Sequence, residues 1–517
     1  MTNFADRSAP RAAPRGARAA AMAHAASHRD VPSAPGGRVS AFNPIAGRRF
    51  DRPGRRAACA MLRAVAVALV VSFPAGAAAA GAAPPAVAGR PRNVIFMIGD
   101  GFGPAYVALA REVAGRPLAL DPHLVGSSAT ASSDARVTDS GAAATALACG
   151  VQAPNLAIGV CAGGLPRRSI LEAAEARGLA TGLVATSRIT HATPAAFAAH
   201  VPKREAEDDI AAQMVRQGIE VVLGGGARHF RPYAAGGRRD DGRDLLAEAR
   251  RRGIEVVADR DGLARAGRGP LLGLFADSHM SYAFERDAAR EPSLVEMTEA
   301  ALARLAVDPD GFFLMVEGSR IDHAGHVHDA AAAAREAIEF DEAFAASLAF
   351  ARRDGRTLVV VTADHETGGL SLGRALDGRA VYDWRPGVLR GVRRSATAMA
   401  ERVGRGDDPR VVLAEDAGLA DLSDEEAAGI RAAAGESRVL AIAEAVNRRA
   451  LVAWTTTGHT GVDVPVWAFG PGAERFAGTR RIDELGRAVA AALGLSIGDV
   501  LETAAAPAGG AAPRREP

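Results

Sequence analysis

The stretch NVIFMIGDGFG, residues 93–103, runs from an unbroken apolar segment into an aspartate flanked by glycines. A short apolar run without alternation is typical of a strand that is buried on both faces of a parallel sheet. Comparable runs recur along the chain between Ala-rich stretches of helical character. This order predicts an α/β fold, a three-layer sandwich whose large, mostly parallel central sheet is flanked by helices. The expected strands cover residues 94–98, 181–186, 221–223, 312–316, 358–362 and 464–469.

Charged side chains follow several of these strands. The first strand runs into Asp100, the fourth into Glu317 in FFLMVEGSRIDHAGH, and the fifth into Asp364 and His365 in LVVVTADHETGG. Ligands of open α/β sheets bind at the carboxyl ends of the strands. We therefore expect these residues to share one site.

The composition fits a large globular protein and argues against some partners. The 517 residues are 48% hydrophobic, enough to bury an extensive core. The 62 basic and 60 acidic side chains leave a formal net charge of +2, which provides no strong field for nucleic acid or an anionic membrane. We expect no nucleic-acid partner.

The N-terminal segment 1–91 is expected to be disordered and to contain an export signal at about 55–80. Basic residues there precede an apolar run at 64–73 and a stretch of small residues, the order of a secretory signal peptide. The apolar run is short for a bilayer span, so we expect cleavage and no permanent membrane anchor. The mature protein would be periplasmic or secreted. Its Cys149 and Cys161 form either one disulfide or two small buried side chains.

The rest of the chain divides into a main domain and an insertion. Residues 375–449 lack the apolar runs expected of strands and contain charged sequences of helical character, such as LSDEEAAGIRAAA. This change predicts an inserted subdomain. Ser423 followed by three acidic residues is typical of a helix N-cap. Residues 92–374 and 450–500 then form the main domain, and the Ala/Pro/Gly-rich tail 501–517 is expected to be flexible.

Several acids and imidazoles have the chemistry of metal ligands. Asp322 and His326 are four residues apart and would lie on one face of a helix, where they could hold a cation or form a plain hydrogen-bonded pair. Adjacent Asp364 and His365 are costly to bury without a counter-ion. His459 in TTTGHTG is a weak candidate by itself. Mixed nitrogen and oxygen ligands suit zinc, whereas carboxylates, hydroxyls and water suit magnesium.

Ser140 in VTDSGAAATALACG is the candidate nucleophile. It would begin an Ala-rich helix whose free N–H groups can hold a phosphate. A plain N-cap serine is the alternative. A bound zinc ion can activate a serine, so no histidine base is required.

These motifs, in this order over about residues 92–374 and 450–495, resemble the alkaline phosphatases that use a metal-activated serine. The resemblance implies two zinc ions and one magnesium ion beside the nucleophile Ser140. The residues implied for the first zinc are Asp322, His326 and His459. Those for the second zinc are Asp100, Asp364 and His365. Those for magnesium are Asp100, Thr193 and Glu317, and the phosphate-binding arginine is Arg204 in THATPAAFAAHVPKR.

Two positions depart from the well-known bacterial pattern. His191 stands where an aspartate is common and His323 where a lysine is common, and both resemble the animal-type enzymes. An imidazole lowers the negative charge at the third site, so we expect weaker magnesium binding and competition from another divalent ion. Direct ligation and a hydrogen bond to a ligand or its water remain alternatives for both histidines.

The resemblance implies hydrolysis of phosphate monoesters to an alcohol and inorganic phosphate through a phosphoserine intermediate, by a homodimer. Related reactions, those of a phosphodiesterase, a sulfatase or a phosphomutase, are the nearest alternatives. Ser140 is followed by Gly-Ala-Ala, whereas a sulfatase needs a Cys/Ser-x-Pro-x-Arg setting. An exported protein that binds metal or phosphate without turnover is the alternative from another class.

Overall fold

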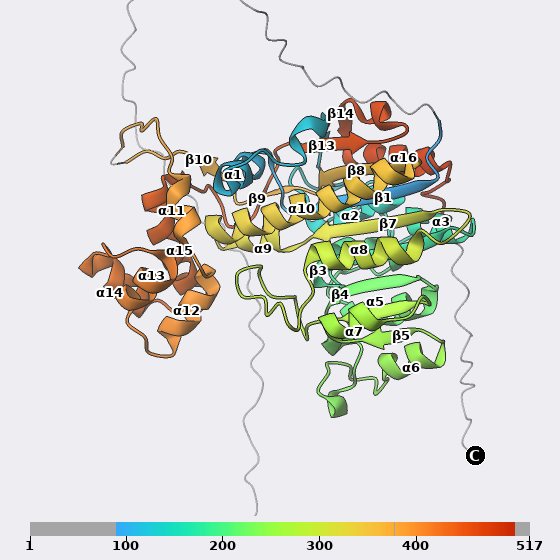
Figure 1. The fold of residues 1–517 in the computed structure, drawn as a ribbon, viewed down its shortest axis with the longest axis horizontal. Helices are drawn as coiled ribbons and strands as arrows, with labels where there is room; N and C mark the ends of the chain where they lie inside the picture. The colour runs from blue at the N-terminus through green and yellow to red at the C-terminus, as the bar shows by residue number, and fades with distance from the viewer. Residues whose placement is uncertain (1–88, 377, 502–517) are drawn as a thin grey trace, which may run out of the picture. The chain divides into compact units, whose positions relative to one another are not determined.

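A computed structural model describes residues 89–376 and 378–501. The predicted signal at 55–80 lies outside the described residues, as does almost all of the tail. Within them, ten strands form one mostly parallel sheet (Figure 1), which confirms the predicted α/β class. In spatial order the strands are β14 (Gly478–Arg481), β2 (Leu124–Ala129), β13 (Val464–Phe469), β8 (Thr357–Ala363), β1 (Asn93–Gly99), β7 (Phe312–Gly318), β3 (Ala180–Arg188), β4 (Val221–Gly225), β6 (Leu271–Leu274) and β5 (Glu255–Val257).

The central strands are buried on both faces, as their apolar sequences require. Every residue of β1, β7 and β8 is buried. Along β1, Ile95 and Met97 belong to one hydrophobic core, whereas Phe96 and Ile98 belong to the other. Successive strand side chains point to opposite faces, so one strand contributes to both layers. All six predicted strands lie within observed strands.

Helices cover both faces of the sheet (Figure 1). One core is closed by α1 (Pro104–Ala114), α7 (Arg260–Arg265), α8 (Leu294–Leu305) and α10 (Ala330–Asp354). The other is closed by α2 (Ser140–Cys149), α3 (Ile170–Glu175), α4 (Ala192–Ala198), α5 (Glu207–Gln217), α6 (Leu245–Arg251) and α16 (Ile482–Leu493). The result is the three-layer arrangement that the sequence predicts.

Five helices occupy the region predicted as an insertion. They are α11 (Pro386–Gly391), α12 (Ala396–Gly404), α13 (Pro409–Ala417), α14 (Asp424–Ala432) and α15 (Glu436–Ala450). The chain leaves and re-enters through paired two-residue strands, β10 (Ser371–Leu372) and β11 (Val452–Ala453). Ser423 caps α14, as predicted, and also forms a capping box with Glu426.

Other features of the described residues bear on the expectations for an exported protein. Cys149 and Cys161 are buried and are not joined by a disulfide. Among the described helices, none combines the length and the apolar character needed to cross a bilayer.

Candidate metal and phosphate site

The parallel register brings three acidic residues to one edge of the sheet. β1 lies between β7 and β8, with Ile98 opposite Glu317 and Gly99 opposite Ala363. Asp100 and Asp364 each come directly after their strand, so they lie beside Glu317. Gly101 permits this approach because its φ is +73° and a side chain there would collide with Asp322.

A first cluster combines Asp322 and His326 of α9 (Arg320–His326) with His459. The His326 Nε2 atom lies 3.2 Å from Asp322 Oδ2 and 3.3 Å from His459 Nε2. The Nδ1 atoms of both imidazoles contact backbone carbonyls, of Thr457 at 2.5 Å and of Thr138 at 2.8 Å. An Nδ1–H that donates to a carbonyl leaves a lone pair on Nε2, so two lone pairs face one point, as metal ligation requires.

Pairing of two very short strands places His459 there. β12 (His459–Thr460) pairs antiparallel with β9 (Glu366–Thr367), which directly follows His365. The His459 and His365 rings consequently stack, with their centroids 3.5 Å apart.

A second cluster is centred on His365. Its Nε2 atom lies 3.2 Å from Asp364 Oδ2, 3.5 Å from Asp100 Oδ1 and 3.2 Å from Ser140 Oγ. Asp322 also has a carboxylate oxygen within reach of a cation shared with Asp100 and His365. The serine and both carboxylates therefore surround one imidazole nitrogen.

A third cluster shares Asp100 with the second. Ligand atoms of Asp100, His191 and Glu317 lie within 4.8 Å of one another. Thr193, two residues after His191 on α4, is fully buried. His323 is not in this group of ligand atoms, although its ring centroid lies 5.7 Å from that of His191. Asp100 thus belongs to both the second and the third cluster.

Ser140 is the first residue of α2 and is almost completely buried. The alternative that it is the N-cap is wrong, because Asp139 takes that position and its Oδ1 accepts from the Ala142 N–H at 3.0 Å. The Ser140 hydroxyl is therefore not used for capping and lies among the clusters. The N–H groups at the start of α2 lack helical partners and can bind an anion.

Arg204 lies beside the serine between two anchors. Its Nη1 donates to Asp139 Oδ2 and its Nη2 contacts His191 Nε2, each at 2.9 Å. Its backbone N–H donates to the Leu156 carbonyl. Arg204 is thus oriented from both ends of its guanidinium group, which suits binding of two phosphate oxygens.

Burial and like charges dominate the electrostatics of the site. Burial, together with neighbouring carboxylates, raises the pKa of Asp100 well above its usual range and that of Asp364 to about 8. Burial also raises the pKa of Glu317 to about 7. The pKa of Asp322 is lowered despite burial in the metal-free fold, because a protonated His326 donates to it through Nε2 and histidine charges lie nearby. A bound cation would take the place of that Nε2 proton. These buried carboxylates carry more negative charge than their surroundings compensate.

The residues fit divalent cations. Both oxygens of Asp100, Oδ2 of Asp364 and Oε1 of Glu317 are buried without a hydrogen-bond partner among the described residues. An unpaired buried carboxylate is strongly unfavourable unless it is protonated or binds a cation. Carboxylates mixed with imidazoles in the first two clusters suit zinc, and the oxygen-rich third cluster suits a harder ion.

Two neighbours of the site were not predicted from the sequence. Thr367 Oγ1 donates to Asp322 Oδ1 at 2.5 Å and contacts His365 Nδ1 at 3.3 Å. His279 follows β6, and its ring centroid lies 4.3 Å from that of His323. Its position after a strand end was the one available signal, but β6 was not among the predicted strands.

An α/β sheet whose carboxyl edge gathers buried carboxylates and imidazoles around a serine at a helix start defines a metal-dependent hydrolase. The family model described as "Alkaline phosphatase" matches residues 91–495. The chain is 40% identical over 427 residues to Alkaline phosphatase 3 of Bacillus subtilis (strain 168), covering 78% of this chain and 90% of that protein. This chain therefore belongs to the alkaline phosphatase family and is a phosphomonoesterase.

Solved structures agree with this assignment. The alkaline phosphatase of Thermus thermophilus is 33% identical with a TM-score of 0.72, covering 80% of this chain and 93% of that one. An alkaline phosphatase of the Antarctic bacterium TAB5, with a histidine replaced by glutamate and Mg bound in its M3 site, is 29% identical with a TM-score of 0.60. It covers 79% of this chain and 99% of that chain. The family implies divalent metals at the site described above.

Proposed function

We propose that this alkaline phosphatase hydrolyses phosphate monoesters through a phosphoserine at Ser140, with two zinc ions and one magnesium ion. Asp322, His326 and His459 would hold the first zinc. Asp100, Asp364 and His365 would hold the second. Asp100, His191, Thr193 and Glu317 would hold magnesium. The observation that carries the proposal is the position of Ser140 Oγ, 3.2 Å from His365 Nε2 among unpaired buried carboxylates.

Cations held by these residues would supply positive charge that stabilises the attacking and leaving oxygens. Ser140 Oγ loses its proton and forms a bond to phosphorus while the ester P–O bond breaks, and the departing alkoxide takes up a proton. Water then loses a proton and forms a new P–O bond while the Oγ–P bond breaks, which releases inorganic phosphate, and Ser140 Oγ takes up a proton again. Arg204 binds non-bridging oxygens, and the α2 N–H groups add further positive potential.

The third metal site is where competition between ions is expected. An imidazole at His191 contributes less negative charge than a carboxylate, which favours softer ions over magnesium. The TAB5 variant, in which a histidine is replaced by glutamate, has Mg in its M3 site. This supports the proposal that His191 weakens magnesium binding here and lets another divalent ion compete.

We further propose the setting in which the enzyme works. The N-terminal segment 1–91 directs export to the periplasm or outside the cell, leaving no permanent membrane anchor. Residues 92–374 and 450–500 form the catalytic domain, and 375–449 form an inserted subdomain. The active form is a homodimer.

Metal analysis combined with rate measurements tests the proposed chemistry. Purified protein should contain about two zinc ions and one further divalent ion per chain. It should hydrolyse a phosphate monoester across alkaline pH, lose this activity in a chelator, and act far more slowly on a diester or a sulfate ester. Equal rates on the diester would contradict the monoester assignment, and full activity without bound metal would contradict the mechanism.

A further inference from the structure

A cavity away from the catalytic clusters is lined by three arginines. It has a volume of 460 Å³ and lies where α10, α11 and the loop before α8 meet. Its lining residues are Ala283, Phe284, Arg335, Arg390, Gly391, Val392 and Arg393. This volume is within the usual range for small-molecule sites, and none of the described residues that line it is acidic.

The three guanidinium groups are not neutralised by the protein around them. Arg335 and Arg393 have no ion pair and no side-chain hydrogen bond within residues 89–376 and 378–501, and the Arg335 Nε atom is buried without a partner. Among the described residues, Arg390 donates only to backbone carbonyls near the end of α1, those of Glu112 at 2.7 Å and Val113 at 3.2 Å. The partial negative charge of this helix C-terminus offsets only part of the arginine's charge, and no described carboxylate pairs with it.

The nearby acids Asp416 and Glu285 form no ion pair with the three arginines in the described part of the chain. Asp416 accepts the backbone N–H of Arg393 through its carbonyl, but its carboxylate pairs with Arg402 at 2.8 Å and Arg394 at 3.5 Å. Glu285, adjacent to Phe284, accepts from the Ser395 N–H at 2.8 Å through Oε1 and does not line the cavity, and its Oε2 atom is buried without a hydrogen-bond partner in the described residues. Gathering three like charges without a counter-ion is unfavourable, and a bound anion would relieve the repulsion.

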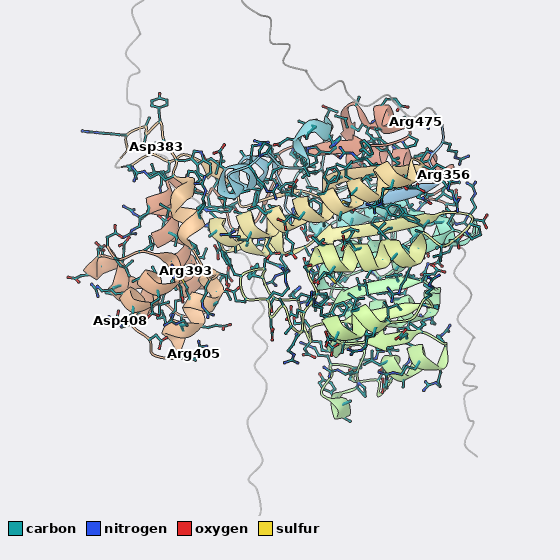
Figure 2. All side chains as sticks on the ribbon, viewed as in Figure 1. Arg356, Asp383, Arg393, Arg405, Asp408 and Arg475 are labelled. Carbon is teal, nitrogen blue, oxygen red and sulfur yellow. The ribbon has the colours of Figure 1, made fainter. Side chains whose placement is uncertain are left out.

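We infer that this cavity is a second anion site that binds a phosphate group, separate from the catalytic one. Guanidinium groups match the oxygens of a phosphate in pairs, and three of them suit a doubly charged anion better than a single carboxylate. Arg393 projects from the helical insertion (Figure 2), whereas Arg335 belongs to α10 of the main fold. A bound phosphate would therefore connect the insertion to the catalytic domain.

Two sources share this chemistry. One is inorganic phosphate, the product of the enzyme itself. The other is a small organic phosphate, whose apolar part could pack on the Phe284 ring, over which Arg335 lies at 5.6 Å from the centroid. The volume of the cavity admits either one.

Counting phosphate sites tests the inference. Equilibrium dialysis of the metal-loaded enzyme against radiolabelled inorganic phosphate should give two sites per chain. Arg393→Gln, a change at an exposed side chain, should weaken one site at least about tenfold. Arg335→Gln should do the same, and Arg204→Gln should remove the other site. Arg448→Gln, an exposed arginine on α15 without a side-chain partner in the described residues, should keep both.

A second probe and a local readout complete the test. A non-hydrolysable phosphonate analogue of a nucleoside monophosphate replaces phosphate in the dialysis. If phosphate binds at the second site and the phosphonate does not, the ligand is the product of the enzyme. If the phosphonate binds there and phosphate does not, the ligand is an organic phosphate. In Arg204→Gln protein, the bound probe should slow hydrogen exchange over residues 386–394. Equal binding of both probes by wild type and Arg393→Gln, or exchange there unchanged by either probe, would overturn the inference.

Discussion

Asp139 caps α2 and forms an ion pair with Arg204, and substitutions can separate these two roles. Its Oδ1 caps α2 by accepting from Ala142 N–H at 3.0 Å and also accepts from Leu156 N–H at 2.9 Å. Its Oδ2 accepts from Arg204 at 2.9 Å. Asp139→Asn keeps the capping oxygen but loses the ion pair, whereas Asp139→Ala loses both. We therefore expect both variants to weaken phosphate binding to the same extent, and we expect Asp139→Ala to lower the free energy of unfolding more than Asp139→Asn does.

The structure sets the expected magnitudes. Breaking a buried ion pair costs about 3–5 kcal/mol, but the two side chains are 19% and 15% exposed and Arg204 keeps its contact with His191. We expect Asp139→Asn to lower the free energy of unfolding by about 1–2 kcal/mol. Asp139→Ala should lower it by about 1 kcal/mol more, the usual value of an N-cap. Both should raise the inhibition constant of phosphate about tenfold, since Arg204 loses one anchor.

Denaturant unfolding and phosphate inhibition of monoester hydrolysis measure these effects. Asp244→Ala is the matched control, because Asp244 caps α6 by accepting from Ala247 N–H and has no contact with Arg204. It should cost about 1 kcal/mol of stability without altering phosphate inhibition. The reasoning fails if Asp139→Asn binds phosphate as tightly as wild type, or if Asp139→Ala is as stable as Asp139→Asn.

Four further predictions concern the nucleophile, the metals and pH. Ser140→Ala should lower kcat by about five decades, close to 7 kcal/mol, while retaining its metals; a loss below tenfold, measured by initial rates, contradicts the nucleophile. His326→Ala should release about one zinc per chain in elemental analysis, and an unchanged zinc content would refute its ligand role. His191→Asp should raise magnesium content under competition with zinc, measured by mass spectrometry, and no change would argue against third-site ligation. Burial raises the pKa of Glu175 to about 7. Between pH 4.5 and 7 the folded state therefore keeps a proton on this carboxyl that the unfolded state has lost, so the free energy of unfolding falls as the pH rises through this window. Glu175→Gln should reduce that fall by about 1–2 kcal/mol after allowance for partial exposure, and urea unfolding of the variant at pH 5 and pH 8 that shows the same fall as wild type would contradict this prediction.

The interior of the sheet was predictable because burial on both faces requires unbroken apolar sequences. β1, β7 and β8 all have that pattern. The strands not predicted from the sequence include β2 (LVGSSA), which is mostly half-buried, and the edge strand β14 (GTRR), which is mostly exposed. Neither contains a long apolar run or a clear alternation of apolar and polar residues. Which strands pair at the edge of a sheet depends on tertiary packing, and this packing cannot be recognised from the local sequence.

The same distinction applies to the site. Residues directly after central strands, such as Asp100 and Asp364, were placed by parallel register, which sequence order indicates. The neighbourhood of His459 depends on a two-residue strand pairing too short to recognise from sequence. His279 follows a four-residue strand with no motif around it. In the Ser140 segment, an aspartate and a serine were both able to cap the helix, and only the structure shows that Asp139 does so.

The buried carboxylates link metal binding to folding. Asp100, Glu317 and Asp364 are fully buried, and raised pKa values show that burial disfavours their charged forms. The metal-free fold must therefore protonate them or bear their repulsion. Divalent ions that bind only the folded chain stabilise it in proportion to the logarithm of their concentration over Kd. The same excess negative charge destabilises the metal-free folded state and stabilises the metal-bound one. Metal binding and folding are therefore thermodynamically coupled at this site.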